Sequence, residues 1–336
     1  MKSLGILYKG ILTRDRGAET ASGPFEVMVA KEVADQIRSW RFIVLLALIV
    51  LTFLGSLYVS LGNIKNAVTI EQDPDGTFVY LKLLTITDGS MPPFHVFLNF
   101  LGPLLGIALG FDAINSEQSN GTLIRLMAQP VYRDNLILAK FVSALIIISH
   151  LFIALALLMI GAGLIITGAN MEPIEVLRIF SFIFISIIYV GFWLSLSIVF
   201  SIGFKQTATS AIAGVGVWLF FTVFYPIVVN MAMKMFIPEQ AMLTQPDAIK
   251  YNDMILNLLR LAPSQLFSDA TTTLLMPSVR SLGPMSMEQM AGAIPSPLPF
   301  KESLMVVWPQ VSGLLAATLF CFACSYYLFM RREIRS

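Results

Sequence analysis

Six long apolar runs divide the sequence and limit the environment in which the chain can fold. A helix needs about 17 to 25 mainly apolar residues to cross a hydrocarbon core of about 30 Å. The chain is 56% hydrophobic and only 13% charged, so it has too few charges to cover a soluble globule. We therefore predict an all-α integral membrane protein with one six-span transmembrane domain at residues 42–330. The predicted transmembrane helices are residues 42–61, 94–111, 141–167, 179–204, 208–229 and 306–330.

The distribution of Lys and Arg predicts how these helices are oriented. An even number of spans places both termini on the same side of the membrane. That side then holds fourteen of the 22 Lys and Arg residues, within residues 1–41, residues 112–140, Lys205 and the tail 331–336. Basic residues are enriched in cytoplasmic segments. We therefore expect a multi-pass protein of the cell membrane, surrounded by lipid, with both termini in the cytoplasm.

The residues before the first span divide into two parts. Residues 1–23 mix charged and apolar residues, and we expect them to form a cytoplasmic arm. From Pro24 onward, apolar residues recur at helical spacing and charged residues occupy the positions between them. This pattern predicts an amphipathic helix at residues 24–41 that lies in the membrane interface.

Residues 112–140 form a compact polar segment between two apolar runs. Each of the six charged residues in it would cost several kcal/mol at the bilayer centre, so the segment must lie at one membrane face. Gly121 indicates a left-handed C-cap at the end of the incoming helix. Thr122 can then N-cap a short second helix that Pro130 ends, and Asp134 can cap the next long helix.

Two segments on the other side of the membrane are long. Residues 62–93 contain a strong turn signal followed by a strand-like stretch at residues 77–81. Residues 230–303 contain helical spacing that is interrupted at Pro263, which predicts two short external helices. The remainder of this segment is rich in Pro, Gly, Ser and Met, and we expect an extended return to the last span.

The sequence lacks the motifs of several common catalytic sites. It contains no phosphate-binding Gly-x-x-x-x-Gly-Lys-Ser/Thr loop, no His-Glu-x-x-His zinc helix and no serine elbow. If the chain moves a substrate with ATP, another chain must therefore hydrolyse the ATP. The net charge of +1 gives no support for a nucleic-acid partner.

Few side chains in or near the spans could carry chemistry. We expect His150 to be a neutral imidazole hydrogen-bonded to a neighbouring helix, because no carboxylate in the apolar cores could pair with it in a proton relay. Cys321 and Cys324 lie in the last apolar run without partner ligands, and we expect them to be inert packing residues.

Three external methionines offer a weak alternative metal site. The thioethers of Met285, Met287 and Met290 could bind copper(I), which prefers soft sulfur ligands. Seventeen methionines are spread through the chain, however, and a Met in a loop is more often a flexible gap filler. We therefore assign no metal site.

Glycines mark one face of the second span. Gly102, Gly106 and Gly110 recur every four residues, a small-xxx-small pattern that allows close helix approach in a bilayer. We expect packing within the chain, with a dimer seam as the alternative. Gly163 and its neighbouring glycines are expected to loosen the outer end of the third span.

The order of these features resembles a known family. Asp112-Ala-Ile-Asn-Ser-Glu117, then Gly121-Thr122-Leu123, Pro130-Val131, Arg133 and Lys140 follow one another along the polar segment. This order resembles the cytoplasmic signature of type-2 ABC transporter permeases. The six spans, the helix before the first span and the helical segment before the last span are similar as well.

The resemblance implies a dimer of permeases, homodimeric or heterodimeric, that rests on two ATP-binding subunits. Residues 112–140 would then be the coupling region, with a coupling helix at residues 122–129 beside a connecting helix at residues 24–41. ATP and Mg would bind in the partner subunits, and this chain would hold no cofactor. The residues expected to couple the chain to the ATPase are Glu117, Gly121, Thr122, Leu123, Ile124, Arg125, Leu126, Met127 and Arg133.

By this resemblance the chain is the permease subunit of an ATP-driven exporter that works by alternating access and is not itself an enzyme. The second and fifth spans line the substrate cavity in the family. The residues expected there are Asn99, Gly106, Val217, Phe221 and Phe224.

Three other functions compete with this interpretation. A secondary transporter needs buried coupling carboxylates or broken helices at the bilayer midplane, and the spans offer little of either. An intramembrane enzyme needs a polar constellation inside the spans, which is missing. A membrane anchor for a soluble complex would use the same surface as a coupling helix, so the sequence leaves that function open.

Overall fold

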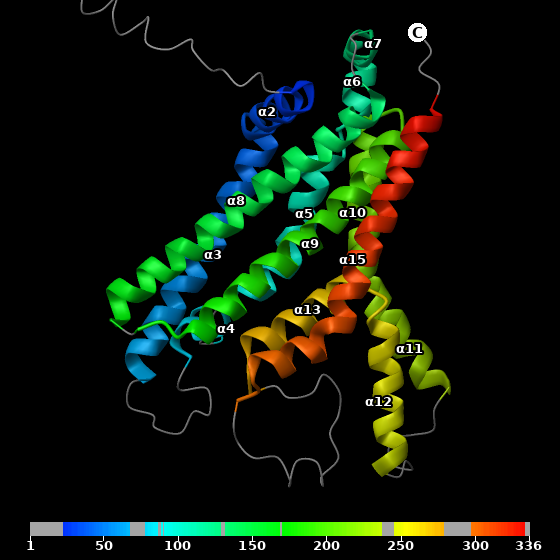
Figure 1. Ribbon diagram of the computed structural model, residues 1–336. Coiled ribbons are helices and arrows are strands. Elements are labelled where there is room, and N and C mark those ends of the chain that lie inside the picture. Colours follow the sequence, from blue (N-terminus) through cyan, green and yellow to red (C-terminus); the bar gives the residue numbers. More distant parts are fainter. Residues whose placement is uncertain are drawn as a thin grey trace, which may run out of the picture.

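The structure, a computed structural model, describes residues 23–67, 78–86, 89, 91–128, 132–168, 170–236, 245–278 and 297–332. Every regular element among these residues is a helix (Figure 1). Six helical stretches are long and apolar enough to cross a membrane, which confirms the predicted all-α, six-span fold. They are α3 (Trp40–Ala67), α5 (Phe94–Gly110), α8 (Arg133–Thr167), α9 (Pro173–Gly203), the stretch α10 (Thr207–Leu219), η1 (Phe220–Phe224) and α11 (Tyr225–Phe236), and α15 (Phe300–Arg331).

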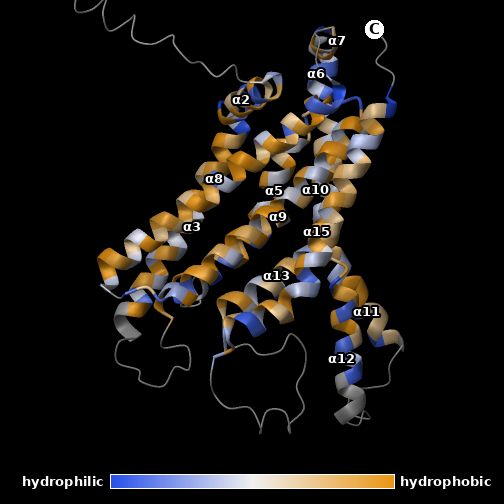
Figure 2. Cartoon of the chain, in the orientation of Figure 1, coloured by the Kyte–Doolittle hydropathy of each residue, from blue (hydrophilic) through white to orange (hydrophobic). Residues whose placement is uncertain are grey.

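The two ends of the bundle carry different short helices. α2 (Pro24–Ile37), α6 (Asn115–Ser119) and α7 (Thr122–Met127) lie at the end where α15 finishes (Figure 1). α4 (Val79–Thr85), α12 (Gln245–Leu259) and α13 (Pro263–Leu275) lie at the opposite end. Figure 2 shows apolar residues along the spans and hydrophilic residues gathered on α6 and one side of α2.

The third span is longer than its apolar run. α8 has 35 residues, about 52 Å at 1.5 Å per residue, so it exceeds the hydrocarbon core. The expected cap at Asp134 is wrong. The N-cap of α8 is Tyr132, and Asp134 lies inside the helix, where its Oδ1 accepts the adjacent amide of Asn135 at 3.0 Å.

Helix α9 is the centre of the bundle. Its most apolar window is 78% buried, whereas the corresponding window of the fifth span is 17% buried. α5 lies so close to α9 that a Cβ at Gly106 would meet the Val190 carbonyl oxygen at 2.6 Å and the Leu194 nitrogen at 2.9 Å. The glycine stripe therefore serves packing within the chain, and this contact occupies the face of Gly106 that we expected to line a cavity.

The strand expected at residues 77–81 is wrong, because α4 begins at Val79. The Glu175 side chain, buried near the start of α9, accepts the Tyr80 amide at 2.8 Å and so satisfies one N–H of the first turn of α4. The Tyr80 ring lies against Gly163, where a Cβ would approach it to 2.7 Å. Gly163 therefore makes room for α4, and α8 continues as a helix to Thr167.

Two helices precede the last span, as predicted, and Pro263 begins the second of them. Arg178, which is fully buried in α9, holds this region in place. Its guanidinium donates to the Leu274 carbonyl at 2.8 Å, in the last turn of α13, and to the Leu298 carbonyl at 2.6 Å. No sequence pattern singles out Arg178, because both acceptors are main-chain atoms about 100 residues away.

The structure shows the surroundings of His150 and of the two cysteines. His150 is exposed, and its Nδ1 lies 2.8 Å from the Ile146 carbonyl of its own helix, so the expected bond to a neighbouring helix is wrong. Cys321 and Cys324 are half-buried free thiols on α15. The copper candidates Met285, Met287 and Met290 lie outside the described residues.

We predict that Gly106→Ala lowers the stability of the purified protein by about 1–3 kcal/mol, because the added methyl group would push α5 away from α9. The measurement is thermal unfolding in detergent. Gly161→Ala is the matched control, since nothing lies within 4 Å of its Cβ position. Equal melting temperatures for the two variants would contradict the close α5–α9 contact.

Candidate functional site

The α6–α7 corner joins the end of α5 to the start of α8 (Figure 1). Gly121 makes the tight turn between the two short helices with φ of 68°, a left-handed conformation that favours glycine. The predicted short helix is present, but Thr122 does not N-cap it. Thr122 lies inside α7, and its hydroxyl donates to the Glu117 carbonyl at 3.1 Å, which ties α7 to α6.

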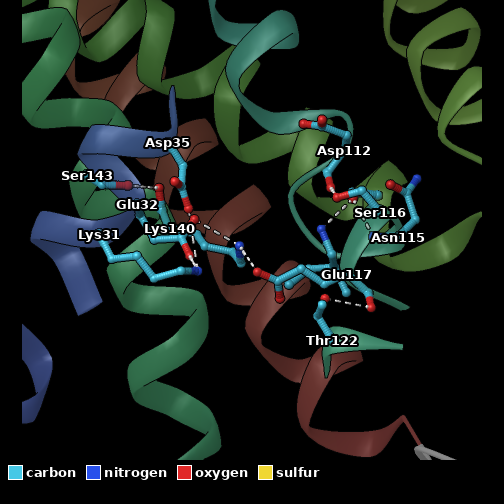
Figure 3. A network of polar contacts seen from close by, with 12 residues as sticks. Lys31, Glu32, Asp35, Asp112, Asn115, Ser116, Glu117, Thr122, Lys140 and Ser143 are labelled. Carbon is cyan, nitrogen blue, oxygen red and sulfur yellow. Dashed lines mark hydrogen bonds and ion pairs between the residues drawn. The ribbon is translucent and has the colours of Figure 1, made fainter. Parts of the chain in front are cut away.

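A buried ion triad joins three helices below the corner (Figure 3). Lys140 of α8 donates to Glu117 of α6 at 2.7 Å and to Glu32 of α2 at 3.0 Å. The Lys140 side chain is only 5% exposed. A buried ammonium group needs such pairing, and removing Lys140 would take the shared cation away from two carboxylates. The triad therefore fixes α2 and α6 to the same turn of α8.

The charge state of Glu32 follows from this environment. Burial alone would raise the pKa of the Glu32 carboxyl group. The attraction and hydrogen bonds of Lys140 and Lys31 together outweigh that effect and lower the pKa below its ordinary value of 4.5. Glu32 is thus an ionised member of the triad at neutral pH.

A second ion pair holds the first span against the corner. Arg41, at the start of α3, pairs with Asp112 just after α5. The Arg41 guanidinium also lies 4.6 Å from the centre of the Phe111 ring, a cation–π contact. These contacts connect the α2–α3 junction to the segment that leads into α6.

Helix α7 presents one face to solvent and buries the other. Leu123 is 2% exposed and packs into the core, whereas Ile124 is 46% exposed. Thr122 and Arg125 are also exposed. Side chains of α7 and α2 border a cleft of about 510 Å³ that includes Glu117 and Lys140. The predicted coupling residues from Glu117 to Leu126 are thus together, and the Met127 side chain is outside the described residues.

Arg133 lies away from this cluster. Its guanidinium donates to the Arg332 carbonyl at the end of α15, at 2.9 Å, so it contacts the last span and not α7. The corner instead has a support that we did not foresee. Ser201 Oγ, in the last turn of α9, accepts the amides of Ile114 and Asn115 at 2.9 and 3.2 Å. One serine among many in the spans carries no sequence signal of such a role.

The other residues expected to line a substrate cavity lie on α5 and the fifth span. Asn99 is half-buried, and its side-chain oxygen accepts the Tyr189 hydroxyl at 3.0 Å. Val217 and Phe221 are half-buried, and Phe224 is 52% exposed. Their role in substrate binding stays a prediction. Within the described ranges, no group of three or more His, Cys, Asp or Glu residues could hold a metal ion.

We predict that acid weakens the α2 contact. The lowered pKa of Glu32 contributes stability that is present above its ordinary value of 4.5 and is lost as the pH falls through and below that value. The melting temperature of the purified protein should therefore fall on acidification from about pH 5 to pH 4. Glu32→Gln should reduce this slope, and an unchanged slope would contradict the assigned ionisation.

We also predict that Lys140→Met lowers stability by about 3–5 kcal/mol, because Glu117 would lose its ion-pair partner and Glu32 would be left with Lys31 alone. Adding Glu32→Gln and Glu117→Gln should recover part of the loss. Chemical denaturation measures both effects. The matched control is Lys205→Met at an exposed position, and equal losses at the two lysines would rule out a special role for the triad.

Comparison with known proteins identifies the family of the chain. A family model described as "ABC-2 family transporter protein" matches residues 27–334. The chain is 28% identical over 228 residues to a "Probable ABC transporter permease protein NosY" of Stutzerimonas stutzeri, which covers 66% of this chain and 75% of the relative. It is 30% identical over 133 residues to the protein of the same name from Pseudomonas aeruginosa, covering 38% of this chain and 46% of that relative. Because the match spans nearly the whole chain, the protein belongs to the ABC-2 family of transporter proteins.

Proposed function

We propose that this membrane subunit of an ABC transporter is driven by a separate ATP-binding subunit that docks on the exposed face of α7. The proposal rests on the contrast between the two faces of α7. Its outer face is open at Thr122, Ile124 and Arg125, and its inner face is fixed through Leu123. A helix that is exposed yet rigidly held suits the transfer of force from a soluble partner.

The triad gives that force a path into the membrane domain. A displacement of α7 acts on α6 through the bond between Thr122 and Glu117. Glu117 is joined to α8 through Lys140, and Lys140 is joined to α2 through Glu32. The helices α8 and α2 would therefore move with the corner, which supports coupling regions at α2 and at residues 112–140.

The remaining parts of the proposal rest on the family. ATP and Mg would bind in two copies of the ATP-binding subunit, and a second permease chain, identical or different, would complete the transport pathway. Outward transport by alternating access is the mode that we propose. The excess of Lys and Arg in residues 1–41 and 112–140, at Lys205 and in the tail 331–336 supports a cytoplasmic position for the α7 end and both termini, where ATP would be available.

We predict that Arg125→Glu weakens binding of the ATP-binding subunit by at least about tenfold, or about 1.4 kcal/mol, because it reverses a charge at the centre of the docking face. The measurement is co-purification from membranes with the product of a neighbouring ATPase gene, followed by ATP hydrolysis by the complex. The melting temperature should stay the same, since Arg125 is exposed.

Lys205→Glu is the matched control. It reverses the same charge at an exposed position between α9 and α10, at the same end of the bundle. Normal association and ATP hydrolysis with Arg125→Glu would refute docking on α7. Normal association with ATP hydrolysis that never produces transport would favour a membrane anchor.

A further inference from the structure

Two helix ends at the α7 end of the bundle are closed by arginines from other helices. The last carbonyl groups of a helix have no partner within that helix. α9 ends at Gly203 and α15 ends at Arg331, so the carbonyls of Ile202 and Arg332 need other donors. A cationic donor is favoured there because helix C-termini carry partial negative charge.

The geometry links the two ends in series. The Arg332 guanidinium donates to the Ile202 carbonyl of α9. The Arg332 carbonyl in turn accepts from the Arg133 guanidinium at 2.9 Å. The Arg133 guanidinium also lies 5.7 Å from the centre of the Phe329 ring, which is 1% exposed in the last turn of α15. The end of α15 is thus held between α8 and α9.

The same turn of α9 also holds the corner. Ser201 accepts two amides from the start of α6, at 2.9 and 3.2 Å, and Ile202 is the next residue. Two adjacent residues therefore bind the α6–α7 corner on one side and the last span on the other. α15 packs along α9 across the bundle. A shift of the last turn of α9 would therefore act on the whole of α15.

We propose that Arg332 and Arg133 are positioning residues that join the α6–α7 corner to α15, so that movement of the corner displaces the last span together with α9. The inference rests on the proposed function, because it requires an ATP-binding subunit to move the corner. It adds a route into the membrane domain that does not pass through the Glu32–Lys140–Glu117 triad.

The test measures movement of α15 at its far end. The chain carries nitroxide labels at Tyr58→Cys on α3 and Lys301→Cys on α15, both exposed, after Cys321 and Cys324 are replaced by Ser. The label on α3 is a reference outside α9, so movement of α15 together with α9 changes the distance between the two labels. It is reconstituted in nanodiscs with its ATP-binding subunit and an excess of unlabelled chain, so that distances within one chain dominate. Pulsed electron paramagnetic resonance then compares the nucleotide-free state with a state trapped with ATP, Mg and vanadate.

We expect a distance shift between the two states in the otherwise unaltered chain and the loss of most of that shift in Arg332→Ala. Arg332→Lys should restore it, because an ammonium group can still donate to the Ile202 carbonyl. Arg331→Ala is the matched control and should keep the full shift, since the Arg331 guanidinium lies over the Tyr327 ring of its own helix, 4.6 Å from the ring centre. If Arg332 only stabilised the fold, the distance shift would not be lost in Arg332→Ala and restored in Arg332→Lys.

Each outcome decides a different claim. A full shift in Arg332→Ala would overturn the inference and leave the proposed function intact. Absence of a shift in the unaltered chain, with the ATP-binding subunit attached, would contradict both. If Arg332→Ala aggregates, Ser201→Ala decides in the same way, because it breaks the link between α6 and the same turn of α9.

Discussion

The ends of a helix leave backbone N–H and C=O groups without partners inside the helix. In or near a bilayer these groups must find other partners, and the structure depends on how they do so. This chain satisfies many of those groups with side chains from distant helices. Glu175 serves the start of α4, and Arg178 serves the end of α13. The start of α6 is bonded to Ser201, the end of α9 to Arg332 and the end of α15 to Arg133. Each bond also fixes one helix to another, so the ends of the bundle are held together by the groups that close its helices.

The buried charges at the α7 end serve the same purpose. Lys140 is expensive to bury alone, and its two carboxylate partners come from α2 and α6. The result is a small surface helix, α7, that is bonded to Glu117 of the triad through Thr122 while its outer face is exposed. That arrangement suits the proposed docking of an ATP-binding subunit better than it suits a substrate site.

The sequence predicted those features that depend on local patterns. Apolar runs located the six spans, and Gly121 located the turn of the corner, because hydropathy and a left-handed turn are properties of neighbouring residues. Long-range partners could not be predicted. The strand expected at residues 77–81 became a helix because Glu175, almost 100 positions away, satisfies its first turn. The roles of Arg178 and Ser201 were missed for the same reason.

The most direct test of docking on α7 places a photo-crosslinking amino acid at Ile124, which is 46% exposed. The full chain is expressed with its ATP-binding subunit, membranes are irradiated, and the products are identified by mass spectrometry. Our account predicts a crosslink from position 124 to the ATP-binding subunit and a much weaker one from the exposed control position Lys205. Capture of that subunit at Lys205 but not at Ile124 would contradict it.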